Sequence, residues 1–343
     1  MTGTIEIDGS YGEGGGQILR TSLAMSLVTG KPFHIENIRL GRKKPGLLQQ
    51  HLTAVNASAR ISQAEVEGNV LGSKKLYFAP KTVKPGRYHF SVKTAGSSTL
   101  VLQTVFPALL ITHGKSELLL EGGTHNPYAP PFDFLARTYL PIISRMGVKI
   151  SATLKRHGFY PVGGGRFNIS IESTGKLSKI NILKRGEIKR QIARAVVAKL
   201  PRSIGEREIK RIGDKLMWDR RCLHIEEVTN SAGPGNVLTV EIESEQITEV
   251  FTGFGERGVS AERVADKIVL EVKEYLSAGV PVGKYLADQL LIPMVLAGGG
   301  TFQTLPLTRH TRTNIEILKQ FLNINITSSQ LKNNVWQIEV RTK

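Results

Sequence analysis

Three segments that begin with glycine or small residues and continue into a leucine-rich run recur along the chain. They cover residues 12–32, 94–114 and 282–302 of the 343-residue sequence. In each segment the leucines fall at helical spacing, the run closes near a glycine, and strand-like sequence follows. Similar segments that return along a chain indicate one supersecondary unit used several times, so they constrain the fold more than any other feature.

Alternating stretches between these segments predict strands. Examples are FHIENIRL (33–40), ELLLEGG (117–123) and FNISIES (167–173). Apolar and polar residues alternate in them with the period of a half-buried strand. Together with the helical segments they predict an α+β fold whose sheets are covered on one face by helices.

Residues 185–278 differ from the rest in composition. The stretch 184–216 is dense in charge and helical in pattern, 236–258 reads as a pair of strands, and 260–276 reads as a helix with a serine cap. A glycine-led segment then returns at 282. We therefore predict a large domain of residues 1–184 and 279–343 with an inserted α+β domain of residues 185–278.

The charge balance predicts a polyanionic partner. The chain has a formal charge of +17 and a pI of about 9.9, which favours nucleic acid or a nucleotide, although a lysine-rich proteome is an alternative explanation. The single cysteine, Cys222, excludes an internal disulfide and fits a reducing compartment. With no secretory signal and no apolar stretch near the roughly 20 residues that span a bilayer, we expect a cytoplasmic protein without a membrane partner.

The loop DGSYGEGGGQILR (8–20) is a candidate anion site. Its glycines let backbone N–H groups approach an anion, and a helix follows. Gln17 and Arg20 would project from one helical face, and Glu13 is an acid that a magnesium or manganese ion would explain. The alternative is a tight hairpin in which the glycines serve geometry alone. The loop is not a dinucleotide fingerprint, because Gln17 stands where the last glycine should be.

Two further stretches carry polar groups that suit a nucleotide. RLGRKKPGLLQQH (39–51) supplies Arg39 and Arg42, then Gln50 and His51, and no nearby carboxylate neutralises the cluster. A solvated basic loop is the alternative. YLADQL (285–290) places Tyr285, Asp288 and Gln289 on one helical face, which would suit stacking on a base and hydrogen bonds to its edge or to the ribose.

His310 is the candidate nucleophile. It lies in RHTRTN (309–314), between a triple glycine and a helix-like stretch. A neutral imidazole attacks phosphorus, and flanking cations would stabilise charge on departing phosphates. No GxSxG elbow, HExxH or paired CxxC occurs, so serine hydrolase and structural zinc chemistry are not indicated.

The combined motifs resemble those of the RNA 3′-terminal phosphate cyclase family. The resemblance runs in order over nearly the whole chain, through DGSYGEGGGQILR, GRKKPGLLQQHLTAV, AGSSTLVLQT, RHGFYPVGGG, YLADQLLIPM and RHTRTN. It implies a large domain of three repeated βαβαββ-like units, with a smaller α+β domain inserted before the third. It also implies an RNA-processing enzyme of ligase type that converts an RNA 3′-terminal phosphate into a 2′,3′-cyclic phosphate, using ATP and a divalent metal.

The resemblance further implies roles for individual residues. His310, in the H-x-x-T-N motif, would attack the α-phosphorus of ATP and hold AMP covalently before AMP passes to the RNA end. The other matched positions fall into three groups: ATP contacts, residues that hold RNA and ATP phosphates, and an acid near the metal. These are Gln103, Pro130, Tyr285, Asp288 and Gln289 for ATP; Arg20, Arg39 and Gln50 for phosphates; and Glu13 for the metal. From the residues themselves we add Gln17, Arg42 and His51 to the groups expected to bind phosphate or RNA.

Two related classes are alternatives. A paralogous branch serves ribosome biogenesis and lacks the histidine nucleophile, so the presence of His310 argues against it. The enolpyruvate transferase class has similar repeats and a basic cleft but needs no histidine–AMP adduct. RNA 3′-phosphate ends and ATP are thus the expected partners, and a homodimer is a further expectation.

Overall fold

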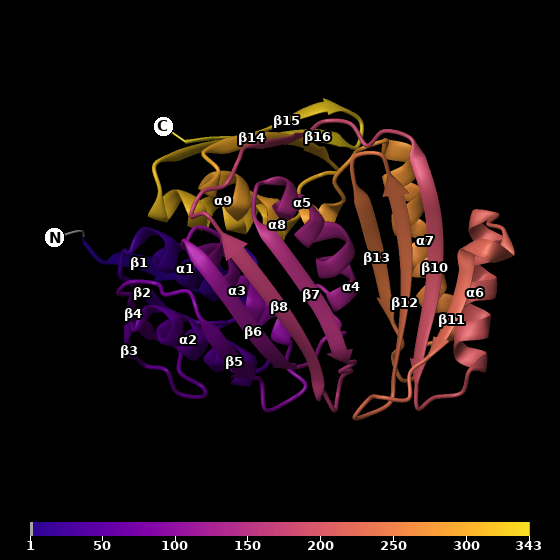
Figure 1. Cartoon of the computed structure of the whole chain (residues 1–343), viewed down its shortest axis with the longest axis horizontal. Helices are drawn as coiled ribbons and strands as arrows, with labels where there is room; N and C mark the ends of the chain where they lie inside the picture. Colours follow the sequence, from indigo (N-terminus) through magenta and orange to yellow (C-terminus); the bar gives the residue numbers. More distant parts are fainter. Residues whose placement is uncertain (1–2, 343) are drawn as a thin grey trace.

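The computed structural model describes residues 3–342, in which four four-stranded sheets are packed with helices (Figure 1). Each sheet contains both parallel and antiparallel strand pairs. Strands and helices of this mixed kind are compatible with the predicted α+β class. Among the described residues, no helix combines the length and apolar character needed to cross a membrane.

The first sheet has the strand order β1-β2-β4-β3. β1 and β2 are parallel, and the other two pairs are antiparallel. Helix α1 connects the parallel strands, and α2 follows β2. The bounds are β1 Ile5–Asp8, α1 Gly16–Thr29, β2 Phe33–Glu36, α2 Gln49–Ser62, β3 Glu65–Glu67 and β4 Leu76–Ala79.

The second sheet has the order β5-β6-β8-β7 and the same directions, with β5 parallel to β6. Helix α3 connects the parallel strands, and a continuous run of α4, the π-helical η1 and α5 follows β6. The bounds are β5 Arg87–Ser91, α3 Ser98–Leu110, β6 Gly114–Gly122, α4 Phe132–Phe134, η1 Leu135–Tyr139, α5 Leu140–Arg145, β7 Lys149–Arg156 and β8 Gly165–Ser173.

The third sheet, read from its other edge, has the order β9-β14-β16-β15. β9 and β14 are parallel, and the remaining pairs are antiparallel. Helix α8 precedes β14, and α9 follows it. The bounds are β9 Ile180–Ile182, α8 Lys284–Leu296, β14 Gly299–Thr304, α9 Arg309–Phe321, β15 Ile324–Lys332 and β16 Val335–Thr342.

The fourth sheet, of order β11-β10-β12-β13, lies in sequence between β9 and α8 and occupies the right side of Figure 1. Helices α6 and α7 pack together and against this sheet, around a core that includes Ile212, Val240 and Tyr275. The bounds are β10 Ile188–Ala198, α6 Ser203–Leu216, the 3₁₀ turn η2 Arg220–Cys222, β11 Leu223–Glu227, β12 Gly235–Ser244, β13 Thr248–Phe254 and α7 Ala261–Ala278.

The secondary structure predicted from local sequence matches most of this fourth sheet and its helices, but it is wrong for one strand. The predicted serine cap exists, since Ser260 Oγ accepts the N–H of Arg263 at 3.3 Å at the start of α7. The predicted strand pair is β12 and β13. The helical pattern read through 184–216 is wrong for 188–198, which form β10. This strand pairs with β11 and β12, and the ladder bonds of a central strand override a weak helical pattern.

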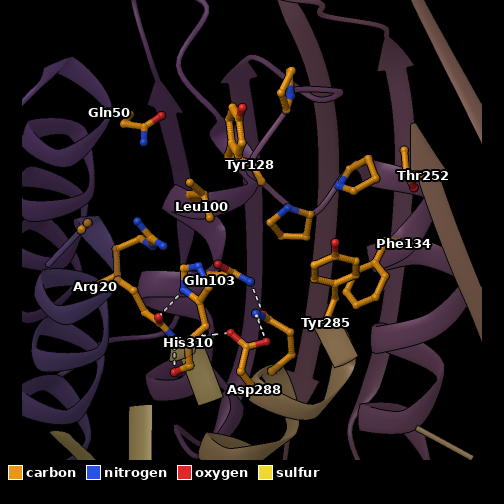
Figure 2. A pocket seen from close by; sticks show the side chains of 18 of the residues that line it. Arg20, Gln50, Leu100, Gln103, Tyr128, Phe134, Thr252, Tyr285, Asp288 and His310 are labelled. Carbon is orange, nitrogen blue, oxygen red and sulfur yellow. Dashed lines mark hydrogen bonds between the residues drawn. The ribbon is translucent and has the colours of Figure 1, made fainter. Parts of the chain in front are cut away.

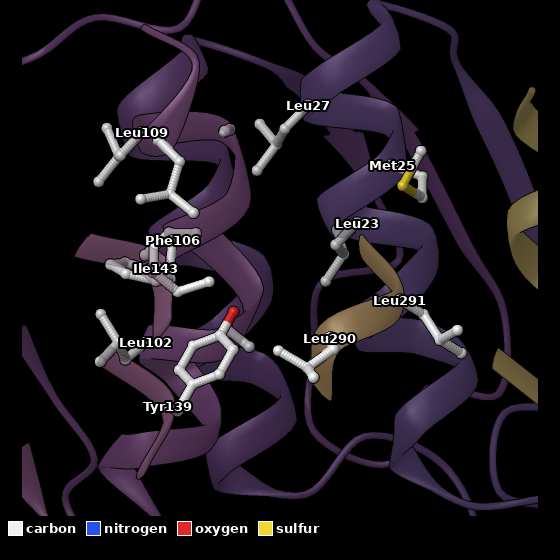
Figure 3. Close-up of a cluster of buried hydrophobic side chains, with 14 of the residues drawn as sticks. Leu23, Met25, Leu27, Leu102, Phe106, Leu109, Tyr139, Ile143, Leu290 and Leu291 are labelled. Atoms are coloured by element: carbon white, nitrogen blue, oxygen red, sulfur yellow. The ribbon is translucent and has the colours of Figure 1, made fainter. Parts of the chain in front are cut away.

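Each of the three glycine-led segments contains a helix: α1, α3 and α8. Side chains of these helices meet in the main core, where Leu23, Leu102, Phe106 and Leu290 are almost completely buried (Figure 3). Burying one such leucine contributes about 2 kcal/mol. α1 ends at Thr29 and is capped by Gly30, whose φ of 70° suits glycine and whose N–H donates to Ser26 O. Packing in this core brings the starts of α1, α8 and α9 together.

Candidate active site

The site residues predicted from the sequence line one pocket of about 900 Å³ (Figure 2). Pockets that hold small ligands span roughly 300–1,000 Å³, so this one lies in the upper part of that range. The lining includes all of the predicted positions: Glu13, Gln17, Arg20, Arg39, Arg42, Gln50, His51, Gln103, Pro130, Tyr285, Asp288, Gln289 and His310. Their roles remain proposals, but their convergence from distant parts of the chain makes this pocket the candidate active site.

His310 lies in the first turn of α9. The helix begins at Arg309 because Thr308 Oγ1 accepts the N–H of Thr311 at 3.1 Å. The pKa of His310 lies below its ordinary value, first because neighbouring protein atoms desolvate the ring and then because Arg20 and Arg42 repel its charged form. At neutral pH the imidazole is therefore uncharged and keeps a lone pair.

Gln17 determines which nitrogen carries that lone pair. Its Nε2 lies 3.3 Å from Asp288 Oδ2 and 3.3 Å from the carbonyl oxygen of His310, and both are acceptors. Its Oε1 lies 2.6 Å from His310 Nδ1. An amide oxygen only accepts, so Nδ1 carries the ring hydrogen and Nε2 is free. The amide that was predicted to bind phosphate thus has protein partners at both ends.

A chain of side chains extends from Gln17 across the floor of the pocket. Gln103 of α3 donates to Gln289 of α8, and Gln289 Nε2 lies 3.3 Å from Asp288 Oδ1. Burial raises the pKa of Asp288 to about 7, an effect that hydrogen bonds from Gln289 and the charge of Arg20 oppose. A carboxyl with a pKa near neutrality next to a candidate nucleophile is typical of functional sites.

The threonine and asparagine of RHTRTN tie α9 to the rest of the site. Thr313 Oγ1 accepts the N–H of Glu13 at 3.2 Å, which attaches the glycine-rich loop to α9. Asn314 donates to Asp288 O at 3.0 Å and accepts from Thr21 Oγ1 at 2.9 Å, so it joins α9 to α8 and α1. These contacts fix the position of His310, and the H-x-x-T-N spacing was their only signal in the sequence.

Positive charge gathers on one side of His310. Arg20 forms no salt bridge within residues 3–342, and burial lowers its pKa to about 10. Asp288 is the carboxyl whose charge acts on this guanidinium, and without a salt bridge the Arg20 donors are suited to phosphate. Arg39 Nη1 instead donates to the carbonyls of Lys44 and Gly46, at 2.7 and 2.8 Å, so it shapes its own loop.

His51 adds a neutral donor to this side. Burial, with Arg20 and Arg39, lowers its pKa to about 3. Its Nδ1 accepts the N–H of Leu48 at 3.2 Å, so Nε2 carries the hydrogen. A Cβ at Gly16 would lie 2.3 Å from that Nε2, so only glycine lets α1 begin this close to His51.

Glu13 is the one acid in the glycine-rich loop at the pocket. Its carboxylate forms a salt bridge with Arg42 and is largely covered, so the expectation that no carboxylate neutralises the basic cluster is wrong for Arg42. Within residues 3–342, no three His, Cys, Asp or Glu side chains gather closely enough to hold a metal ion by themselves. Magnesium is often held by one or two carboxylates together with substrate phosphates, and the residues here fit only that mode.

The fourth sheet and α7 supply a wall that the sequence did not indicate. Thr252, Glu256, Lys267 and Glu271 line the pocket from this side. Glu271 Oε1 accepts the hydroxyl of Tyr285 at 3.0 Å, which sets the angle of that ring. No local signal marked these residues, because each is an ordinary polar position of β13, of α7 or of the loop between them.

A buried acid connects this wall to α8. Glu249 of β13 is 2% exposed and accepts the N–H of Gly283, the residue before α8, at 2.9 Å. Burial raises its pKa from 4.5 to about 8. The folded state therefore binds more protons than the unfolded state between these values, and stability falls as pH rises through this window.

We expect Glu249→Gln to stabilise the protein at pH 8 and to have little effect near pH 5. The gain at pH 8 should be on the order of a few kcal/mol, because the amide carries no charge to bury. Thermal unfolding at both pH values measures it. Glu243→Gln, a change at a partly exposed position on the neighbouring strand β12, is the matched control. An identical pH dependence for wild type and Glu249→Gln would contradict the assignment.

The fold and the pocket define a class of protein: a protein of mixed helices and sheets whose pocket combines a neutral histidine, arginines and aromatic side chains, a set of groups suited to a phosphorylated ligand. A model of the family described as RNA 3′-terminal phosphate cyclase matches residues 11–328. The chain belongs to this family, as its motifs predict.

Curated relatives agree with this assignment, and each is named RNA 3′-terminal phosphate cyclase. The protein of Koribacter versatilis (strain Ellin345) is 51% identical over 329 residues, which cover 96% of this chain and 93% of that protein. The protein of Ectopseudomonas mendocina (strain ymp) is 46% identical over 98% of both chains. The protein of Salmonella agona (strain SL483) is 43% identical over 100% of this chain and 99% of its own.

Proposed function

We propose that the chain converts the 3′-terminal phosphate of RNA into a 2′,3′-cyclic phosphate, with ATP as the second substrate. The observation that carries this proposal is the free Nε2 of His310, held by Gln17 in a pocket that also contains Arg20 and Arg42. Family membership supports the reaction, and the pocket chemistry supports a histidine nucleophile over the histidine-free paralogous branch.

The proposed reaction has three displacements at phosphorus. His310 Nε2 attacks the α-phosphorus of ATP, a P–N bond forms, and pyrophosphate leaves with the broken P–O bond. An oxygen of the RNA 3′-phosphate then attacks the AMP phosphorus and frees the imidazole. The ribose 2′-oxygen finally attacks the RNA phosphorus, loses its proton and expels AMP. Arg20 and Arg42 would stabilise the charge that develops on the phosphate oxygens.

The adenosine would lie between Tyr285 and Pro130, both of which line the pocket. An aromatic face and a proline ring would form a flat apolar slot for the base, and Gln103, Asp288 and Gln289 would offer hydrogen-bonding groups at its floor. Arg39, Gln50 and His51 are proposed to contact RNA and ATP phosphates. Arg39 would do so mainly by holding the shape of its loop.

We further propose that three units of one topology make up residues 1–184 and 279–343. The identical strand order and directions of three sheets support this. The unit formed by residues 185–278 would then be an insert. Because β9 precedes it and pairs with β14, the insert would follow the first strand of the third unit instead of preceding the unit. Cytoplasmic location and a homodimer stay predictions.

Mass spectrometry tests the proposed function. Protein incubated with ATP and magnesium should gain the mass of AMP, and peptide mapping should find the adduct on His310. The same protein without ATP is the control. Conversion of RNA in the absence of ATP, or an adduct on another residue, would overturn the proposed mechanism.

We expect Gln17→Leu to slow AMP uptake about fivefold to tenfold, since one hydrogen bond contributes roughly 1–1.5 kcal/mol. Leucine cannot accept from Nδ1, so the ring hydrogen is free to move to Nε2 and block the nucleophile. Nitrogen NMR of His310 reports the tautomer directly and would not respond to a purely structural defect. Gln17→Glu, which keeps the acceptor for Nδ1 but loses the two donations of the amide to Asp288 and the His310 carbonyl, is the comparison. An unchanged tautomer in Gln17→Leu would contradict this positioning role.

Glu13 is proposed to hold a divalent cation together with the phosphates of ATP. A cation there would neutralise charge on the phosphate oxygens. We expect Glu13→Ala to weaken manganese binding to the ATP complex about tenfold, as titration by electron paramagnetic resonance would measure. Arg42→Ala removes the salt-bridge partner but no carboxylate, and at saturating ATP it separates metal binding from loop order. Equal manganese affinity in wild type and Glu13→Ala would exclude Glu13 as a ligand.

A further inference from the structure

Tyr128 is a fully exposed aromatic residue in the lining of the pocket. Its relative exposure is 100%, and its φ of 63° places it in the left-handed region that a bulky side chain rarely adopts. A side chain that contributes no burial in a strained backbone has no evident structural purpose. Strain of this kind concentrates at functional sites.

The loop that carries Tyr128 is anchored on both sides. Asn126 donates to the carbonyl of Ala95, and the Phe132 N–H donates to Thr124 O at 3.0 Å. His125 Nε2 lies 2.8 Å from Asp133 Oδ2. Pro127, Pro130 and Pro131 stiffen the segment between these anchors. The tyrosine ring is therefore presented to solvent by a rigid support.

The segment 95–97 places this loop beside the phosphate side of the pocket. Ala95 binds the Tyr128 loop, and the N–H of Ser97 donates to Gln50 Oε1 at 3.0 Å. In Figure 2, Tyr128 and Gln50 lie in the upper part of the pocket, and Asp288 lies at the bottom. Tyr128 is thus available to a ligand other than the adenosine assigned to Tyr285.

We propose that Tyr128 is the stacking platform for the 3′-terminal nucleobase of the RNA. The proposal rests on the proposed function, which puts the RNA 3′-phosphate next to His310 in this pocket. The base on the same ribose would then extend toward the mouth, where an exposed aromatic face is the complementary surface. Every base has a π-face, so this contact would hold the terminal nucleotide without selecting its identity.

The test is equilibrium binding, measured by fluorescence anisotropy of 5′-labelled RNAs that end in a 3′-phosphate. One RNA is complete, one lacks the terminal base, and one lacks the penultimate base. The proteins are wild type, Tyr128→Ala, Tyr128→Leu and Tyr128→Phe. Leucine keeps apolar bulk without a π-face, and phenylalanine keeps the ring. Because Tyr128 is fully exposed, the melting temperatures of all four should agree.

For complete RNA, the Kd should rise about tenfold in Tyr128→Ala and Tyr128→Leu and stay near wild type in Tyr128→Phe. The Kd of wild type should rise by a similar factor when the RNA lacks its terminal base. For that abasic RNA, Tyr128→Ala should have the same Kd as wild type. If Tyr128→Ala raises the Kd equally for complete RNA and for RNA without its terminal base, the stacking assignment is overturned. Coupling to the penultimate base, or a raised Kd for ATP, would also overturn it.

Uptake of AMP by wild type separates this inference from the proposed function. One outcome is that wild type takes up no AMP while the effect of Tyr128→Ala on the Kd still depends on the terminal base. In that case the proposed cyclase reaction is wrong and the stacking site is retained. If AMP is taken up on His310 and no coupling is found, only the stacking site is overturned.

Discussion

His310→Ala should abolish AMP uptake from ATP, lowering its rate by about a thousandfold or more, as removal of a catalytic nucleophile commonly does. Alanine offers no lone pair to the α-phosphorus, and no second histidine is bonded to Gln17 in residues 3–342. The change lies at an exposed position in the first turn of α9, and alanine favours a helix, so the fold should persist. Retention of radioactive phosphate from α-labelled ATP measures the effect.

His224→Ala is the matched control, because His224 is an exposed histidine of β11 outside the pocket lining. It should retain full AMP uptake. Equal melting temperatures and ATP affinities for wild type and His310→Ala would locate the defect in chemistry. A cyclic RNA end produced by His310→Ala would show that another group is the nucleophile.

An RNA that ends in a 3′-phosphate on a 2′-deoxyribose should accept AMP and then stall. Charging of His310 involves no RNA, and the transfer of AMP uses only the 3′-phosphate. Cyclisation needs the 2′-oxygen, which the ribose itself holds beside the activated phosphorus, so no further protein nucleophile is required. The adenylated end should accumulate while the cyclic product is absent, and gel analysis against ordinary RNA resolves both species.

The two substrates also test recognition. If the deoxy substrate fails to accept AMP, the 2′-hydroxyl is needed for binding, and the division between charging and cyclisation is wrong. Tyr128→Ala with saturating deoxy RNA should still stall at the same species, because the stacking contact acts on affinity and leaves the order of the steps unchanged.

Local sequence predicted secondary structure correctly where the cap or the alternating pattern lies within the element itself. The serine cap at Ser260 and the strand pair β12–β13 follow from short-range pattern, and both are present. It failed at β10, where charge and helical spacing suggested a helix. Pairing with β11 and β12 makes that segment a strand. Local periodicity does not predict hydrogen bonds to strands that are distant in sequence.

The chemical inventory of the site could be predicted from sequence, since glycine-rich loops, arginines and the H-x-x-T-N motif are contiguous patterns. The relative positions of these groups could not be predicted from sequence. Gln17 and His310 are 293 residues apart, and only their contact assigns the ring hydrogen to Nδ1 and the lone pair to Nε2. Glu271 and Tyr128 acquire their positions only when α7 and an anchored loop close the pocket. Residue types set which reactions are available, but the protonation, exposure and orientation of each group depend on neighbours that tertiary packing alone provides.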